Sequence, residues 1–231
     1  MDKQQGLSLV ELMVGLLLAS LLSLMAFSLL WQQQSAWREQ MALQQLQEDG
    51  QLVLRVFQDE ITQAGIGVPT PLLAVDNPRA REGNLNEDNS VLTFTSQDVT
   101  DCLGRTLETM EVVINQYYVR ANSEGIPALY CRAFARGTWE EAELVRGVEH
   151  FQAVVLAKSV EEGSYGVYAP ERLPDSMQAL AVSLLFILKH PDTKPRYPMA
   201  FSYMDMFGLV HHLPEEGIYQ RFFLHRSLFN G

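Results

Sequence analysis

One carboxylate lies inside the most apolar segment of this 231-residue chain. Glu11 is followed by a stretch from Leu12 to Trp37 that contains no charged residue. An ionised carboxylate in lipid costs about 2.5–3.5 kcal/mol at the centre of a bilayer, and less near its edge. Glu11 is therefore either a side chain that reaches the membrane interface or a group whose function needs a negative charge at that place.

The chain has few other groupings that suggest chemistry. No Gly-x-Ser-x-Gly, P-loop or His-Glu-x-x-His pattern occurs in it. His211 and His212 would point to opposite faces of a strand, and no third ligand stands at a useful spacing. Asp59 and Glu60 are expected on the solvated face of a helix, and residues 163–166 are expected to form a loop. The sequence therefore predicts a protein that is not an enzyme, with no catalytic residue, cofactor or metal.

The charge balance argues against one class of partner. The chain has 28 Asp and Glu against 17 Lys and Arg, so its formal net charge is −11. Nucleic-acid binding requires clustered positive side chains that neutralise phosphates, so we expect no nucleic-acid partner. The length suffices for one globular domain with a sizeable core, plus an appendage.

Two cysteines, Cys102 and Cys131, lie well beyond the apolar segment. In an exported region this pair would form a disulfide, whereas two buried thiols would be the expected state in a cytosolic protein. The placement of the chain relative to the membrane decides between the two.

The apolar segment must be a helix if it lies in a membrane. Leu12 to Leu30 is almost wholly apolar, and about 20 such residues suffice to cross the hydrocarbon core of a bilayer. A secretory signal peptide fits less well, because no small-x-small cleavage site closes the run and helix-forming residues follow it directly.

Beyond the apolar run, the pattern is that of an amphipathic helix. Apolar residues recur at helical spacing between charged and amide side chains, which predicts one buried stripe. Its members are Leu43, Leu46, Val53, Phe57, Ile61 and Ala64. Gly50 is expected to mark a bend, and the glycines and proline of residues 65–69 are expected to end the helix. The whole helix would run from about Ser8 to about Ala64.

Runs rich in β-branched and aromatic residues follow, and they predict strands. They cover residues 91–95, 112–119, 128–134, 151–157, 180–188, 201–210 and 219–229. The segment 70–89 before them is rich in Pro, Asn and charge, and it predicts an irregular connection. One long helix followed by several strands predicts an α+β fold in which the helix lies on an antiparallel sheet.

The N-terminal residues carry a family resemblance. Gly6-Leu7-Ser8-Leu9-Val10-Glu11 resembles the processing signature of type IV prepilins and their pseudopilin relatives. The resemblance implies that a prepilin peptidase cuts between Gly6 and Leu7 on the cytoplasmic side, and that the new N-terminus at Leu7 is methylated. Leu7 departs from the Phe that the family most often has there. Glu11 becomes the fifth mature residue, where the family has a glutamate, and its carboxylate can pair with the N-terminal amine of a neighbouring subunit.

Further segments resemble the PilW-like minor pilins and occur in the same order. They are Leu46–Gly50, Asp101–Gly104, Tyr117–Val119, Leu129–Cys131, Leu144–Gln152 and, more loosely, Arg221–Asn230. Arg146 and His150 depart from the family pattern. This resemblance implies a minor pilin that helps to initiate assembly of a type IV pilus and is located at the fibre tip. Its partners would be other minor pilins, the major pilin and a tip adhesin.

Other functions compete with this interpretation. A minor pseudopilin of a type II secretion system is the alternative within the same class. A periplasmic enzyme held by a membrane helix would need a polar cluster in a pocket. A binding module such as a DNA-uptake receptor would need a basic patch, and the charge balance argues against one.

The prepilin resemblance divides the chain into four parts: a leader peptide, 1–6; a transmembrane and fibre-core half of the helix, 7–31; an amphipathic half, 32–65; and a β-rich, pilin-like periplasmic domain, 66–231. Lys3 keeps the leader in the cytoplasm by the positive-inside rule. We therefore expect a single-pass inner-membrane protein, with its N-terminus cytoplasmic and its C-terminal domain periplasmic, that later joins a pilus on the cell surface. Export of this domain favours the disulfide between Cys102 and Cys131.

Overall fold

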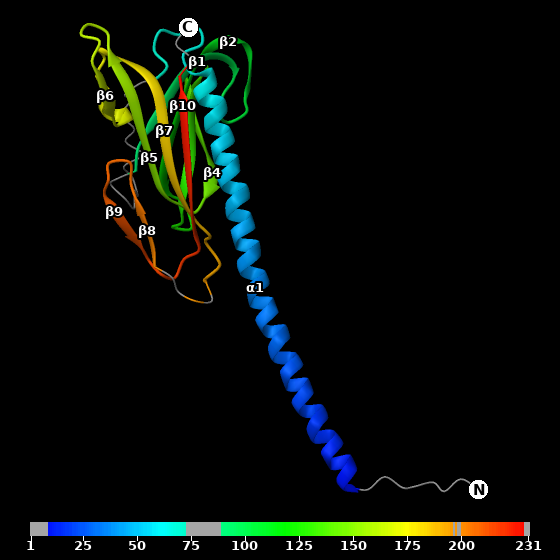
Figure 1. Ribbon diagram of the computed structural model, residues 1–231. Helices are drawn as coiled ribbons and strands as arrows, with labels where there is room; N and C mark the ends of the chain where they lie inside the picture. Colours follow the sequence, from blue (N-terminus) through cyan, green and yellow to red (C-terminus); the bar gives the residue numbers. More distant parts are fainter. Residues whose placement is uncertain (1–8, 73–88, 196, 198–199, 229–231) are drawn as a thin grey trace. The chain divides into compact units, whose positions relative to one another are not determined.

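The fold consists of one long helix and antiparallel strands (Figure 1). The computed structural model describes residues 9–72, 89–195, 197 and 200–228. Helix α1 runs from Leu9 to Gln63, so it ends just before the glycines predicted to stop it. The predicted α+β class, with a helix packed against antiparallel sheets, is confirmed. Residues 1–41 and 42–231 form two compact units, and each is described by itself.

The described part of the first unit is the N-terminal portion of α1. Every side chain from Leu9 to Gln34 is exposed in the isolated chain. The hydroxyls of Ser20, Ser23 and Ser28 each donate to a backbone carbonyl one turn earlier, at 2.8 Å. In lipid such groups must find partners within the helix, and these serines do. Among the described residues, this helix is the one long and apolar enough to span a membrane.

The second unit contains two four-stranded sheets and a hairpin, and each pairing is antiparallel. The first sheet has the order β1 (Leu92–Thr100), β2 (Thr106–Ala121), β3 (Pro127–Ala135) and β4 (Thr138–Arg146). The second has the order β10 (Tyr219–Ser227), β7 (Met177–Lys189), β5 (Val148–Ser159) and β6 (Tyr165–Tyr168). The hairpin pairs β8 (Phe201–Met204) with β9 (Val210–Leu213), and a short 3-10 helix, η1, covers Pro170–Arg172.

The strand prediction needs three corrections. Strand β4 was not expected, because its run of glutamates masks the alternation of an edge strand. Residues 163–166 are not all loop, since Tyr165 and Gly166 begin β6. The single strand expected over 201–210 is in fact divided between two strands, β8 and β9. The side chain of Asp205 fixes the turn between these strands, because it accepts hydrogen bonds from the backbone N–H groups of Phe207 and Leu209.

One aromatic ring of α1 holds the core of the second unit together. Phe57 has no exposed surface, and four rings from both large sheets surround it. Its ring centroid lies 4.7 Å from Tyr117 (β2), 5.3 Å from Phe186 (β7), 5.6 Å from Phe151 (β5) and 6.4 Å from Phe94 (β1). The helix is thus the element on which the two sheets meet.

The buried stripe of α1 differs from the predicted one at its N-terminal end. The buried residues are Ala42, Leu46, Gly50, Val53, Phe57 and Ile61. Leu43 is 42% exposed, because the helical period places Ala42, four residues before Leu46, toward the core instead. At Gly50, where a bend was expected, α1 continues without a break in the helix. A Cβ at Gly50 would lie 2.0 Å from Cζ of Phe222, so glycine permits close packing of β10 on the helix.

Gly147 joins the two large sheets. It follows β4, its N–H donates to the carbonyl of Pro127 in β3, and its carbonyl accepts from the N–H of Lys189 in β7, both at 2.7 Å. Its φ is +75°, and an added Cβ would lie 2.1 Å from the Lys189 carbonyl oxygen. Only glycine combines this backbone conformation with so close a contact.

Because Phe57 lies at the centre of the core, truncation of its side chain is predicted to cause a large loss of stability. We expect Phe57→Ala to lower the free energy of unfolding by about 3–5 kcal/mol, because the cavity would open at the junction of both sheets. Phe223 of β10 is 58% exposed and provides the matched control, for which we expect a change within about 0.5 kcal/mol. Urea unfolding in detergent micelles, followed by near-UV circular dichroism, measures both. Equal losses in the two variants would contradict this account of the core.

Candidate assembly segment and disulfide-linked turn

Glu11 lies in the first turn of α1 and is exposed there. It is the sole charged residue between Leu9 and Trp37. A carboxylate in the first helical turn interacts favourably with the helix dipole, so this position suits a negative charge better than the middle of the apolar run would. Gly6 and Leu7, the residues of the predicted cut, lie outside the described residues, so cleavage stays a prediction.

The two cysteines form a disulfide, as predicted. Cys102 lies in the turn between β1 and β2, Cys131 lies in β3, and their Cα atoms are 6.4 Å apart. Cys131 has no exposed surface. In the chain-entropy model, closing a loop with a sequence separation of 29 stabilises a fold by roughly 3–4 kcal/mol. The disulfide therefore fastens the β1–β2 turn to the third strand of the same sheet.

Asp101 shapes the turn that carries Cys102. One of its carboxylate oxygens accepts the backbone N–H groups of Leu103 and Arg105, each at 3.0 Å. The other accepts from Nε of Arg105 at 2.6 Å. Arg105 also contacts the carboxylate of Glu140 on β4 at 2.5 Å. The segment 101–105 is thus a defined turn with internal hydrogen bonds.

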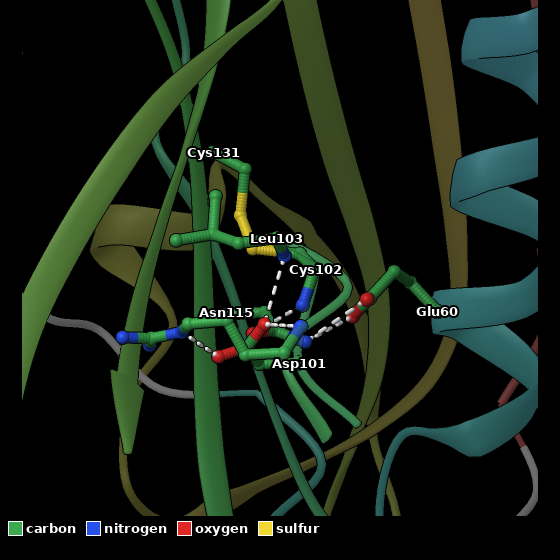
Figure 2. Close-up of a disulfide and its surroundings, with 7 residues drawn as sticks. Glu60, Asp101, Cys102, Leu103, Asn115 and Cys131 are labelled. Atoms are coloured by element: carbon green, nitrogen blue, oxygen red, sulfur yellow. Dashed lines mark hydrogen bonds and ion pairs between the residues drawn. A yellow bond between two sulfur atoms is a disulfide. The ribbon is translucent and has the colours of Figure 1, made fainter. Parts of the chain in front are cut away.

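Glu60 does not lie on the solvated face of α1, so this expectation was wrong, whereas Asp59 is exposed as expected. Glu60 follows Phe57 by three residues, which places it beside the buried stripe and toward β2. Its two carboxylate oxygens accept from Nδ2 of Asn115 at 2.9 and 3.2 Å. Oδ1 of Asn115 accepts in turn from the N–H of Cys102 at 3.2 Å (Figure 2).

Burial dominates the electrostatics of Glu60. Desolvation raises the pKa of its carboxyl to about 7, although hydrogen bonding to Asn115 and the nearby Tyr117 hydroxyl act in the opposite direction. The negative charges of Asp98 and Asp59 raise this pKa further. The same burial, together with Glu60, raises the pKa of Tyr117 well above its ordinary value. No sequence pattern indicated this group, because Glu60 stands among the polar residues of an amphipathic helix.

This pKa predicts how stability depends on pH. The unfolded chain releases the Glu60 proton near 4.5, whereas the folded chain retains it up to about 7. Between these pH values the folded state therefore binds more protons than the unfolded state. The contribution of Glu60 to the free energy of unfolding is full below about pH 4.5 and is lost as the pH rises through about 7. A shift of this size corresponds to a loss on the order of 3 kcal/mol.

Urea unfolding at pH 5 and pH 8 tests this prediction. Glu60→Gln keeps a hydrogen-bond acceptor without the titration, so wild type is expected to lose stability relative to it as the pH rises. Asp59→Asn, at the exposed neighbouring position, controls for removal of a charge from this part of the helix. A stability difference between wild type and Glu60→Gln that is the same at both pH values would contradict the assignment.

The adjacent histidines lie on opposite faces of β9, as predicted. His211 is partly buried, donates from Nε2 to Oδ2 of Asp205 at 3.0 Å, and stacks on Tyr203 with centroids 5.1 Å apart. His212 is exposed. Within the described ranges, no group of three His, Cys, Asp or Glu side chains is placed to hold a metal ion. His211 therefore has a structural contact in the hairpin.

Two protein-family models match parts of the chain. Residues 1–27 match the prokaryotic N-terminal methylation motif, and residues 116–155 match the type IV pilus-assembly protein W family, PilW. Together they support a type IV prepilin-like protein. No curated protein and no solved structure matches the chain.

The match to the PilW family narrows the class of protein from prepilin-like chains in general to those of the minor-pilin type. It covers the end of β2, all of β3 and β4, and most of β5, including Cys131 and Gly147. The matched families support a minor-pilin type of role in a pilus, with membrane anchoring through the N-terminal helix and contacts to other pilus components. Both families are of the structural, pilin type, which is consistent with a protein that is not an enzyme.

Proposed function

We propose that the chain is a minor pilin that helps to initiate assembly of a type IV pilus and is located at the fibre tip. The observation that carries the proposal is the coincidence of two features in the first residues. The match to the methylation motif covers residues 1–27, and within it Glu11 is the only charge on an exposed apolar helix. The match to PilW supports the minor-pilin branch of the family.

Processing is the first step of the proposed function. The prepilin peptidase cuts between Gly6 and Leu7 at the cytoplasmic face of the inner membrane, and the amine of Leu7 is methylated. The apolar part of α1 holds the subunit in the membrane until assembly. The domain after the helix lies in the periplasm, and the disulfide between Cys102 and Cys131 supports this orientation, because disulfides persist in oxidising compartments.

Assembly is the second step. The carboxylate of Glu11 pairs with the N-terminal amine of a neighbouring pilin, so that two opposite charges compensate each other in an apolar environment. The partners are other minor pilins and the major pilin, and an adhesin is carried at the tip. The exposed apolar surface of α1 is covered by the helices of these neighbours in the fibre.

Localisation and loss of function together test this proposal. A strain that lacks the chain should have few or no surface pili, and a tagged copy should restore them. Immunogold labelling of the tag should mark one end of sheared fibres, and other minor pilins should co-purify with it. Labelling along the whole fibre would contradict the tip position. Intact pili combined with a defect in protein secretion would favour the pseudopilin alternative.

A further inference from the structure

The disulfide joins a strand to a turn, and side chains determine where that turn lies. Cys131 belongs to the β-ladder of the first sheet, whereas Cys102 lies two residues beyond the end of β1 and outside the ladder. The internal hydrogen bonds of Asp101 fix the shape of the turn. They do not fix its position against the core face of the sheet, which must come from contacts with other elements.

Asn115 provides such a contact at Cys102 itself. Its side chain is 4% exposed and lies where the end of α1, strand β2 and the turn meet (Figure 2). The amide oxygen accepts the N–H of Cys102, while the amide nitrogen donates to Glu60. The backbone of the cysteine is thus connected to the helix through a single side chain.

Glu60 determines which way this amide points. Above the pKa of Glu60 its ionised carboxylate only accepts hydrogen bonds, so it selects the orientation in which Nδ2 of Asn115 faces the helix. Oδ1 is then turned toward the N–H of Cys102. The reversed amide would place a donor against a donor at Cys102 and an acceptor against an acceptor at Glu60, and both groups would lose a hydrogen bond in a buried place.

We infer that Glu60 is a positioning residue for the disulfide: through Asn115 it holds the backbone of Cys102 opposite Cys131, so that disulfide formation depends on docking of the end of α1 against the first sheet. The disulfide then closes efficiently only in a chain whose helix is already in place. The inference concerns folding of the second unit and does not depend on the proposed function.

The reaction is a thiol–disulfide exchange with a small-molecule disulfide. The thiolate of one cysteine attacks a sulfur of the oxidant and releases one thiolate, which takes up a proton. The second cysteine, as its thiolate, attacks the protein sulfur of this mixed disulfide, and the second oxidant thiol leaves. The two cysteines are oxidised by two electrons, and the oxidant is reduced to two thiols.

Redox equilibration with glutathione tests the inference on the full chain in detergent micelles. The reduced protein is incubated at pH 8 in mixtures of oxidised and reduced glutathione, quenched with acid, and alkylated, so that intact mass gives the disulfide fraction. We expect Glu60→Ala and Asn115→Ala each to lower the equilibrium constant for disulfide formation about tenfold. The double variant should show no further loss, because the two residues act in series. Glu60→Gln, whose amide oxygen can still accept from Asn115, should stay near wild type.

Two controls separate positioning from general stability. Asp59→Ala changes the exposed carboxylate next to Glu60, and Leu184→Ala weakens the core on β7, which belongs to the other large sheet. Both should keep the wild-type constant at a temperature where circular dichroism shows the reduced proteins to be folded. Three results would each overturn the inference. They are a wild-type equilibrium constant for disulfide formation in Glu60→Ala, additive losses in the double variant, and a loss in Leu184→Ala as large as that in Glu60→Ala.

Discussion

Glu11→Val is expected to leave the chain inserted and cut, and to reduce its co-purification with other minor pilins. In the proposed processing step the peptidase recognises the leader and Gly6, which this substitution does not touch. The variant lacks the carboxylate that, in the proposed assembly step, neutralises the N-terminal amine of a neighbour. An unpaired charge of this kind in an apolar core costs several kcal/mol, roughly 3–5 when one partner of a buried pair is removed. Such a loss reduces an association constant by more than a hundredfold, so few or no surface pili should form.

Two matched variants identify the role of the charge. Glu11→Asp keeps a carboxylate on a shorter side chain and should recover part of the co-purification. Leu12→Val changes a neighbouring apolar residue of the same helix without altering charge, and it should behave as wild type. Pull-down from detergent-solubilised membranes and counts of sheared pili measure the effect. Normal piliation with normal co-purification in Glu11→Val would remove Glu11 from the assembly mechanism, while the cleavage prediction would stand.

Gly6→Phe is expected to block processing completely. A glycine before the cut lets an extended backbone enter a protease groove with no side chain in the way, and a benzyl group would occupy that space. The uncut chain should stay in the membrane, keep its leader and be absent from pili. Gly15→Ala is the control, because a Cβ at Gly15 meets nothing within 4 Å and the residue lies beyond the cut. Cutting of Gly6→Phe at the wild-type rate would contradict the predicted cleavage site.

The helix could be predicted from the sequence because its two signals are long. The apolar run and the amphipathic stripe together extend over most of Leu9–Gln63, and a wrong assignment at one residue leaves the pattern intact. Leu43 illustrates the limit of such a pattern. Leu43 and Ala42 are adjacent and both apolar, and only the packing of the helix on the sheets decides which one is buried.

Contacts between distant elements could not be predicted. Gly50 suggested a bend when taken alone, and its packing against Phe222 of β10 becomes visible only when both elements are in place. Glu60 was assigned to solvent because charged residues on an amphipathic helix usually lie there. Its actual partner, Asn115, stands 55 positions later in the sequence. Strand β4 was missed for a related reason, because an edge strand needs only one apolar face and carries charge that protects its open side.

The disulfide could be predicted by a short argument, because Cys102 and Cys131 are the one possible pair in the sequence once export of this region is expected. Its position in the fold could not, because the turn at 101–105 depends on Asp101 and Asn115 for its shape and place.

Intact-mass analysis of the mature chain tests the central claim most directly. The full-length protein is co-expressed with a prepilin peptidase, purified from membranes, and measured together with its N-terminal sequence. The account predicts a chain that has lost Met1 to Gly6, begins at Leu7 and carries one methyl group on its new amine. An uncut chain, or a chain cut after the apolar run that ends at Leu30, would contradict it.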